Sequence, residues 1–101
     1  MIAYTYEEEK IVALHFADRL NNDAVAKIIH TGIVENSDEA NLLSQFFWKM
    51  NAKAISDDEQ NIKIPCEGSS EYWLEKIYNS WEGYMLKNGF IEQWDEASDN
   101  A

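Results

Sequence analysis

Residues 36–54 read NSDEANLLSQFFWKMNAKA, the most regular pattern in the chain. Asn36 or Ser37 can cap a helix, and Glu39 is placed to complete a capping box. Apolar side chains then recur every three to four positions, which is the period of one helix face. They are Leu42, Leu43, Phe46, Phe47, Met50 and Ala54. The pattern predicts a helix of about four turns, and an all-α fold is the simplest expectation.

A second long helix is predicted towards the C-terminus. It should begin at Ser69 or Ser70 and end at Asn88 and Gly89, with Phe90 packing back after the Gly89 cap. One face carries Trp73, Leu74, Ile77, Tyr78, Trp81, Tyr84 and Met85, and the opposite face carries Glu71, Glu75, Asn79 and Glu82. This helix should therefore bury an aromatic stripe and expose a row of carboxylates.

Two shorter helices are predicted before residue 36. Thr5 and Glu8 form a capping-box pattern for the first. Its apolar face comprises Tyr6, Val12, Ala13, Phe16, Ala17 and Leu20. Asp23 can cap a second helix over residues 24–31, and Gly32 suits the left-handed position that ends it.

Residues 55–69 interrupt the helical periodicity. Residues 56–59 suggest a solvated turn or a short helical start, and Ile62 and Ile64 alternate like a short strand before Pro65. The expected fold is therefore a small all-α domain of three or four helices, with room for one minor β-element around residues 61–65. We expect a single compact domain over residues 1–94 and a frayed acidic tail over residues 95–101.

The charge balance restricts the classes of partner. The chain has 101 residues, with 19 Asp and Glu against 8 Lys and Arg, a formal net charge of −11. A nucleic-acid binder gains affinity by neutralising phosphates with cations, so direct nucleic-acid binding and anionic membranes are disfavoured. A basic partner would be attracted instead. The chain has one cysteine, no signal-peptide pattern and no long apolar run, so we expect a cytoplasmic protein.

Catalytic, metal-binding and cofactor-binding patterns are missing from the sequence. His15 falls on the expected polar side of the first helix, and His30 lies in the last turn of the second. Cys66 follows Pro65 in acidic surroundings, which do not favour a reactive thiolate. We therefore expect no enzyme, no cofactor and no metal.

The candidate partner-binding residues are carboxylates and one tryptophan. Glu71, Glu75 and Glu82 follow one helix face over about 16 Å, at ~1.5 Å per residue, and can stand in for a row of backbone phosphates. The other acidic candidates are Asp57, Asp58 and Glu59. Trp48 points away from the apolar stripe of its helix, as an interface anchor would.

These features favour a non-enzymatic interaction protein that binds a basic partner, such as the nucleic-acid-binding groove of a DNA- or RNA-handling complex, and inhibits it. In size, acidity and aromatic content the chain is similar to small phage and mobile-element inhibitors, including anti-restriction and anti-CRISPR proteins. The similarity is one of composition, so it assigns no family and no residue roles.

The alternative hypothesis is a small-molecule or nucleotide-binding helical module. Its ligand would stack between Trp73, Tyr78 or Trp81, and the module could be a homodimer.

Overall fold

A computed structural model describes residues 3–90 of the chain, and this part contains four α-helices and no strand. They are α1 (Glu7–Arg19), α2 (Asp23–Thr31), α3 (Ser37–Glu59) and α4 (Ser70–Lys87). The expected all-α class is confirmed. The expected tail over residues 95–101, and the end of the expected domain, lie outside the described residues.

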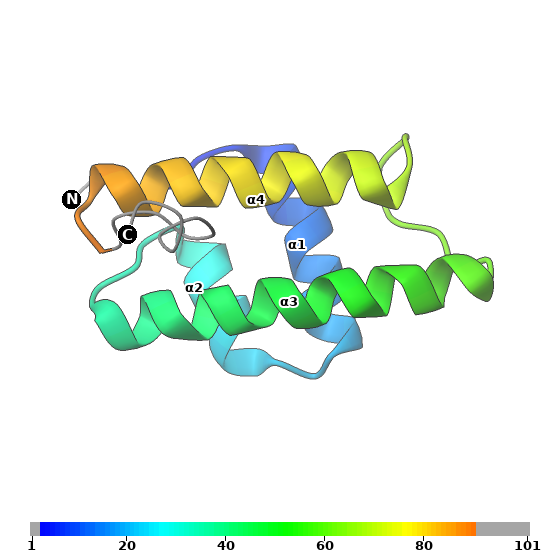
Figure 1. Ribbon diagram of the computed structural model, residues 1–101, viewed down its shortest axis with the longest axis horizontal. Helices are drawn as coiled ribbons and strands as arrows, with labels where there is room; N and C mark the ends of the chain where they lie inside the picture. The colour runs from blue at the N-terminus through cyan, green and yellow to red at the C-terminus, as the bar shows by residue number, and fades with distance from the viewer. Residues whose placement is uncertain (1–2, 91–101) are drawn as a thin grey trace, which may run out of the picture.

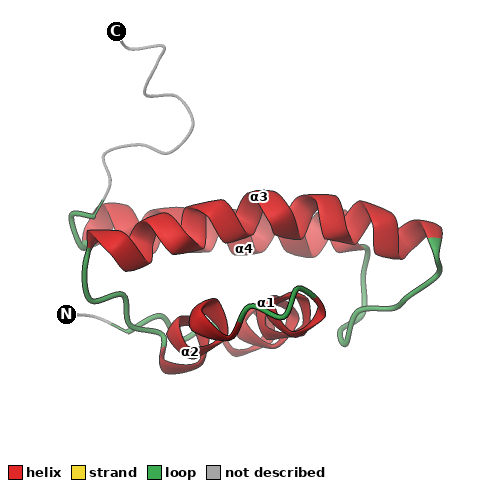
Figure 2. Cartoon of the chain, turned by 90° about the horizontal axis from the view of Figure 1, so that it is seen from below, coloured by secondary structure: helices red, strands yellow, loops and turns green. Residues whose placement is uncertain are grey.

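The helices form two layers. The long helices α3 and α4 run side by side in opposite directions (Figure 1), and α1 and α2 form a second layer on one side of them (Figure 2). Burial of apolar side chains between the layers is the main favourable term in folding. The largest fully buried apolar side chains are Trp81, Phe16, Phe46, Ile29, Leu43, Met50, Ile77, Met85, Val12, Val25 and Val34. All four helices therefore contribute to one core, and the opposite face of the α3–α4 layer is left without a covering helix among residues 3–90.

Three helix starts have side-chain caps, and two of these caps are the expected ones. The Asn36 side chain accepts a hydrogen bond from the Glu39 backbone N–H at 2.9 Å, as predicted for α3. Ser69 caps α4 at the predicted position. The second helix is capped by Asn22 rather than Asp23, so it begins one residue earlier than expected.

The end of α4 is a Schellman motif, as the glycine predicted. The Phe90 N–H donates to the Met85 carbonyl at 3.0 Å, and the Gly89 N–H donates to the Leu86 carbonyl at 3.1 Å. Phe90 then packs against the core. The predicted fold-back of this residue is confirmed.

The N-terminal prediction was wrong in its details. Thr5 does not cap α1, because the helix begins at Glu7 and its N-cap, Tyr6, makes no side-chain capping bond. Tyr6 is 59% exposed, whereas Tyr4 is only 2% exposed and belongs to the core. The chain reaches α1 in an extended form, so the buried tyrosine precedes the helix and does not belong to its periodic apolar face.

Tyr4 is held in the core by contacts to three other parts of the chain. Its backbone N–H donates to the Gly32 carbonyl at 2.6 Å. Its ring stacks on Trp81 with centroids 3.9 Å apart, and its hydroxyl donates to the buried Glu9 carboxylate at 2.6 Å. Gly32 has φ of 73°, and a Cβ there would collide with the Tyr4 carbonyl oxygen. Glycine is therefore required at position 32, where the chain passes against the backbone of Tyr4.

The region after residue 54 also differs from the prediction. Residues 56–59 form the last turn of α3 rather than a solvated turn. Residues 61–65 form no strand, so the expected β-element is absent from the described residues, although Ile64 packs against the core. In the stripe of α3, Leu42 is partly exposed and the other five apolar residues are buried. The pattern therefore identified the correct face of α3 but ended the helix one turn too early.

Candidate partner-binding groove

An open groove lies between α3 and α4, with a volume of about 700 Å³. All its lining residues belong to these two helices, so it lies on the face of the layer that α1 and α2 leave uncovered. They are Phe47, Trp48, Met50, Asn51, Ala54, Ile55, Asp58, Ser70, Glu71, Leu74, Glu75 and Tyr78. We call this surface the α3–α4 groove.

The two walls of the groove follow the helical repeat. On α3, the exposed residues of the wall are Trp48, Asn51, Ile55 and Asp58, at alternating spacings of three and four. On α4, the spacings from Glu71 to Glu75 and then to Tyr78 are four and three. Such spacings keep side chains on one line along a helix. Each helix therefore presents a continuous ridge.

The antiparallel register of the helices defines the two ends of the groove. At one end the Ser70 hydroxyl donates to the Asp58 carboxylate at 3.1 Å. Towards the other end the rings of Phe47 and Tyr78 meet edge-to-face, with centroids 6.3 Å apart. The buried side chains of Phe47, Met50 and Ala54 lie between the ridges and form an apolar floor.

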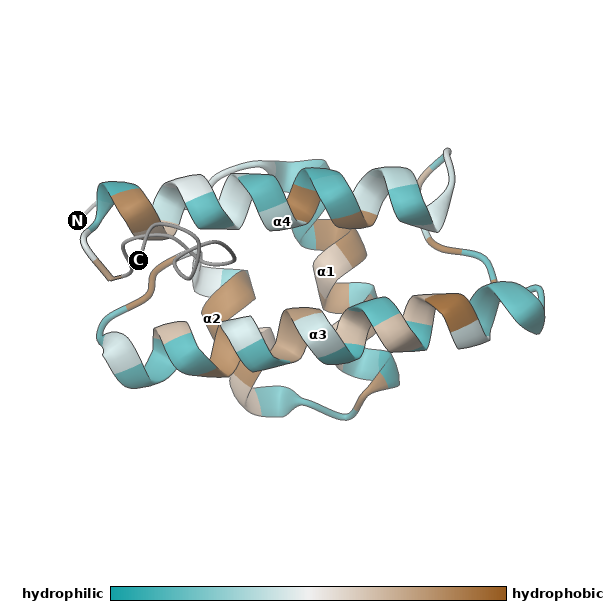
Figure 3. Cartoon of the chain, in the orientation of Figure 1, coloured by the Kyte–Doolittle hydropathy of each residue, from teal (hydrophilic) through white to brown (hydrophobic). Residues whose placement is uncertain are grey.

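The α3 ridge exposes large apolar side chains. Trp48 is 80% exposed and Ile55 is 57% exposed, and both line the groove. The prediction that Trp48 points away from the buried stripe is confirmed. Figure 3 shows apolar segments among hydrophilic ones on both long helices. Single exposed apolar residues are common on monomers, but several around one groove are typical of an interaction site.

The charged side chains that line the groove are all carboxylates: Asp58, Glu71 and Glu75. None of the three forms an ion pair with another residue in the described range 3–90. The groove is therefore both apolar and negatively charged, and these charges are not neutralised by the described part of the chain.

Lys76, the lysine nearest these glutamates in sequence, does not neutralise them. Its ammonium group donates to the Tyr72 hydroxyl at 3.4 Å and lies over the rings of Tyr72 and Trp73. The hydrogen bond to Tyr72 raises the pKa of Lys76, with smaller contributions from Glu9 and Glu8 of α1. The ammonium group of Lys76 therefore lies against these two aromatic side chains.

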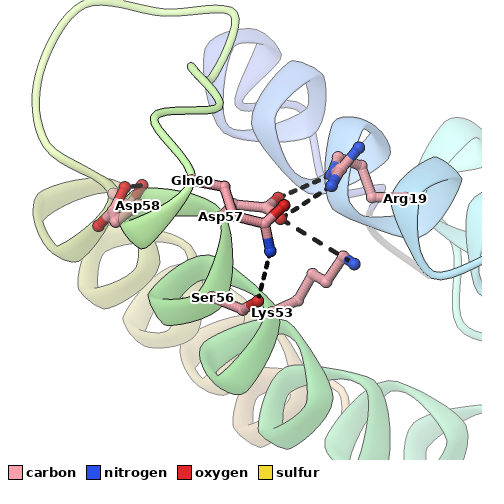
Figure 4. A network of polar contacts seen from close by, with 7 residues as sticks. Arg19, Lys53, Ser56, Asp57, Asp58 and Gln60 are labelled. Atoms are coloured by element: carbon pink, nitrogen blue, oxygen red, sulfur yellow. Dashed lines mark hydrogen bonds and ion pairs between the residues drawn. The ribbon is translucent and has the colours of Figure 1, made fainter.

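The prediction that Asp57 is a partner-binding residue was wrong. It is only 2% exposed and accepts two hydrogen bonds from the Arg19 guanidinium, at 2.7 and 2.9 Å, with the Lys53 ammonium 4.0 Å away. The hydrogen bond from Arg19 lowers the pKa of the Asp57 carboxyl. Figure 4 shows Asp57 directed at α1 and Asp58 on the other side of α3. Asp57 joins two helices and is not available to a partner.

The other acidic candidates are divided by the fold. Glu71, Glu75 and Asp58 come together at the groove. Glu59 is exposed at the end of α3, and Glu82 is half-buried on α4, but neither lines the groove. The predicted row of three glutamates on α4 is therefore reduced to Glu71 and Glu75 at the groove, because Glu82 is partly covered.

The aromatic residues proposed to stack a ligand do not form an open site. Trp73 is buried and its indole N–H donates to the Glu67 carbonyl at 2.7 Å. Trp81 is fully buried against Tyr4. Of the three residues, Tyr78 alone reaches the groove. Within residues 3–90, these three side chains therefore do not line a common open site.

The histidines and the cysteine are dispersed. His15 is half-buried rather than on a polar face, its Nε2 atom has no hydrogen-bond partner among residues 3–90, and burial lowers its pKa. His30 is exposed in the last turn of α2, as predicted, and Cys66 is half-buried in the loop before α4. Within the described range, no three His, Cys, Asp or Glu side chains are grouped so that they could hold a metal ion. No helix in this range has the length and apolar character needed to cross a membrane.

Comparison of the chain with protein-family models, curated proteins and solved structures gives no match. The functional argument therefore rests on the α3–α4 groove itself.

Proposed function

We propose that this chain is a non-enzymatic interaction protein that binds a basic partner protein through the α3–α4 groove. The observation that supports the proposal is the combination of an 80% exposed tryptophan with three carboxylates that form no ion pair within residues 3–90, all around one apolar groove. A matching partner surface carries Lys or Arg side chains around an apolar pocket or ridge.

The two components have separate roles in binding. Trp48 offers a large apolar surface that loses contact with water in a complex, which is the usual basis of an interface hot spot. The carboxylates of Asp58, Glu71 and Glu75 attract cations and set the register of the partner. The net charge of −11 extends this attraction beyond the contact surface and raises the association rate.

A nucleic-acid-binding surface is the partner class that best suits this charge. Such a surface is rich in Lys and Arg because it neutralises phosphates. A chain that occupies it competes with DNA or RNA and acts as an inhibitor. Glu71 and Glu75 on the α4 ridge are the groups that take the place of phosphates in this role.

The test is capture of partner proteins from the native host by four forms of the chain. These are the wild type, Trp48→Ala, the charge reversal Glu71→Lys with Glu75→Lys, and a control reversal, Glu7→Lys with Glu35→Lys. The control changes the net charge by the same amount, at exposed positions outside the groove. We expect the wild type and the control to retain a basic protein at low salt, and both groove variants to lose about ten-fold or more in affinity.

Salt and nucleic acid provide two further readouts. Retention should fall as NaCl is raised from about 50 to about 500 mM, because screening weakens the attraction between exposed charges. Added DNA or RNA should release a partner whose nucleic-acid site is occupied. If the control reversal weakens capture as much as the groove reversal, the groove is not the binding site.

A further inference from the structure

We infer that the occupant of the α3–α4 groove is a basic amphipathic α-helix of the partner protein. The inference rests on the proposed function and adds the conformation of the partner segment. Three properties of the groove support it: its shape, its lack of backbone groups for a partner, and its charge.

The shape of the groove suits a third helix. The ridges on α3 and α4 are antiparallel and alternate spacings of three and four, as in helices that accept a neighbour by knobs-into-holes packing. From Trp48 to Asp58 the α3 ridge extends about 15 Å, at ~1.5 Å per residue. A partner helix of about three turns spans this length.

Backbone hydrogen bonding disfavours an extended segment. The walls of the groove are helices, whose interior N–H and C=O groups already bond to one another, and the described residues contain no strand with a free edge. A segment that enters the groove finds no backbone partners there, and unpaired polar groups are costly once buried. A helix satisfies its own backbone and brings only side chains to the floor.

The charge of the groove determines the composition of that helix. Carboxylates stand on both ridges, Asp58 on α3 and Glu71 and Glu75 on α4. The last turn of α3 contains no basic residue, so the negative end of that helix adds to the potential near Asp58. The partner helix therefore places apolar residues every three to four positions against the floor, with Lys or Arg on both flanks.

The same charges disfavour a second copy of this chain as the occupant. Two copies joined through the groove would bring the carboxylates of both ridges together. No Lys or Arg among residues 3–90 lines the groove to separate them. Each copy also has a net charge of −11. Self-association through this face therefore works against electrostatic repulsion.

The test uses synthetic peptides of about 14 residues. The first places Leu at helical spacing with Lys on both flanks. The second has the same composition in scrambled order, the third replaces Lys by Glu, and the fourth carries a central proline that breaks the helix. Affinity is measured by fluorescence anisotropy of labelled peptides, and helix formation on mixing is measured by circular dichroism.

We expect the first peptide to gain helix content and to bind at least about ten-fold more tightly than the other three. Trp48→Ala should weaken this binding by about ten-fold or more. Glu71→Gln with Glu75→Gln should reduce both the affinity and its dependence on salt. The control Leu86→Ala, at an exposed apolar position outside the groove, should leave binding unchanged.

Other results separate this inference from the proposed function. Equal binding of all three Lys peptides, still sensitive to Glu71 and Glu75, overturns the helical mode and leaves binding of a basic partner intact. Failure of every Lys peptide at low salt, while the wild type still captures a basic protein, overturns the helical mode alone; failure of both the peptides and the capture overturns the proposed function as well. A wild-type dimer in sedimentation that Trp48→Ala dissociates assigns the groove to a second copy and overturns the inference.

Discussion

Among individual residues, Tyr4 makes the contact that the helical pattern least suggests. Its hydroxyl donates to the buried Glu9 carboxylate, and burial raises the pKa of Tyr4, so this group remains a donor at neutral pH. Tyr4→Phe keeps the ring stacked on Trp81 but leaves the carboxylate without this donor. The free energy of unfolding should fall by about 1–3 kcal/mol.

Urea denaturation measures this loss. Tyr6→Phe is the matched control, because Tyr6 is exposed and its hydroxyl makes no comparable buried bond to another of the residues 3–90. Its effect should stay within about 0.5 kcal/mol. A similar loss in both variants would show that the Tyr4–Glu9 bond does not carry the effect.

Asp57 and His15 should make the free energy of unfolding depend on pH in two different ranges. The folded-state pKa of Asp57 lies below its ordinary value of 3.8, because Arg19 donates hydrogen bonds to it. Its contribution to stability is therefore complete above about pH 4 and is lost as the pH falls through 3.8 and below. The pKa of His15 lies below 6.5, chiefly because of burial and then because of Arg19. The unfolded chain takes up this proton first, so stability also falls as the pH drops through 6.5.

Unfolding free energies measured between about pH 2 and pH 8 separate the two groups. His15→Gln should flatten the curve near pH 6, and Asp57→Asn should flatten it below pH 4. A curve that keeps the wild-type slope near pH 6 in His15→Gln would assign that slope to another group.

Among the helices, α4 contains a glycine that the fold does not need. Gly83 lies on the exposed side of the helix, and a Cβ there would meet no atom within 4 Å. Gly83→Ala should raise the free energy of unfolding by about 1 kcal/mol, because alanine loses less backbone entropy in a helix. Gly32→Ala should lower it, since that residue has positive φ and lies against Tyr4. Thermal denaturation of both variants checks the opposite signs.

Helix boundaries were predictable where a local signal encodes them. The caps at Asn36 and Ser69 and the ending at Gly89 involve residues within a few positions of one another, and the structure confirms all three. The end of α3 was not predictable in this way. Asp57 is buried because Arg19, on another helix, pairs with it, and a sequence window around residue 57 contains no sign of that partner.

The candidate site was predictable in its parts and not as a whole. The exposure of Trp48 followed from its position away from the apolar stripe of α3, and Glu71 and Glu75 followed from the pattern of α4. The groove exists because α3 and α4 pack with these sides next to each other. That register involves contacts between the two helices, such as Ser70 with Asp58 and Phe47 with Tyr78, which no single-helix pattern contains.

Across the whole molecule, the net charge predicts opposite effects of salt on folding and on binding. Like charges repel in the compact state, and salt screens this repulsion. Raising NaCl from about 10 to about 150 mM should therefore raise the thermal midpoint of the free chain, as the Debye length falls from about 30 Å to about 8 Å. The same change should weaken the complex with a basic partner. Calorimetry of the free chain and titration of the complex measure the two effects, and a midpoint that falls with salt would contradict the first.

The stacking of Tyr4 on Trp81 also has a consequence for biosynthesis. The ribosome produces α1, α2 and α3 before Trp81, so the ring that covers Tyr4 emerges after most of the chain. Until α4 is complete, the apolar sides of the earlier helices lack part of their cover and are open to association with other nascent polypeptides. A premature stop before α4 therefore yields an aggregation-prone product rather than a smaller stable domain.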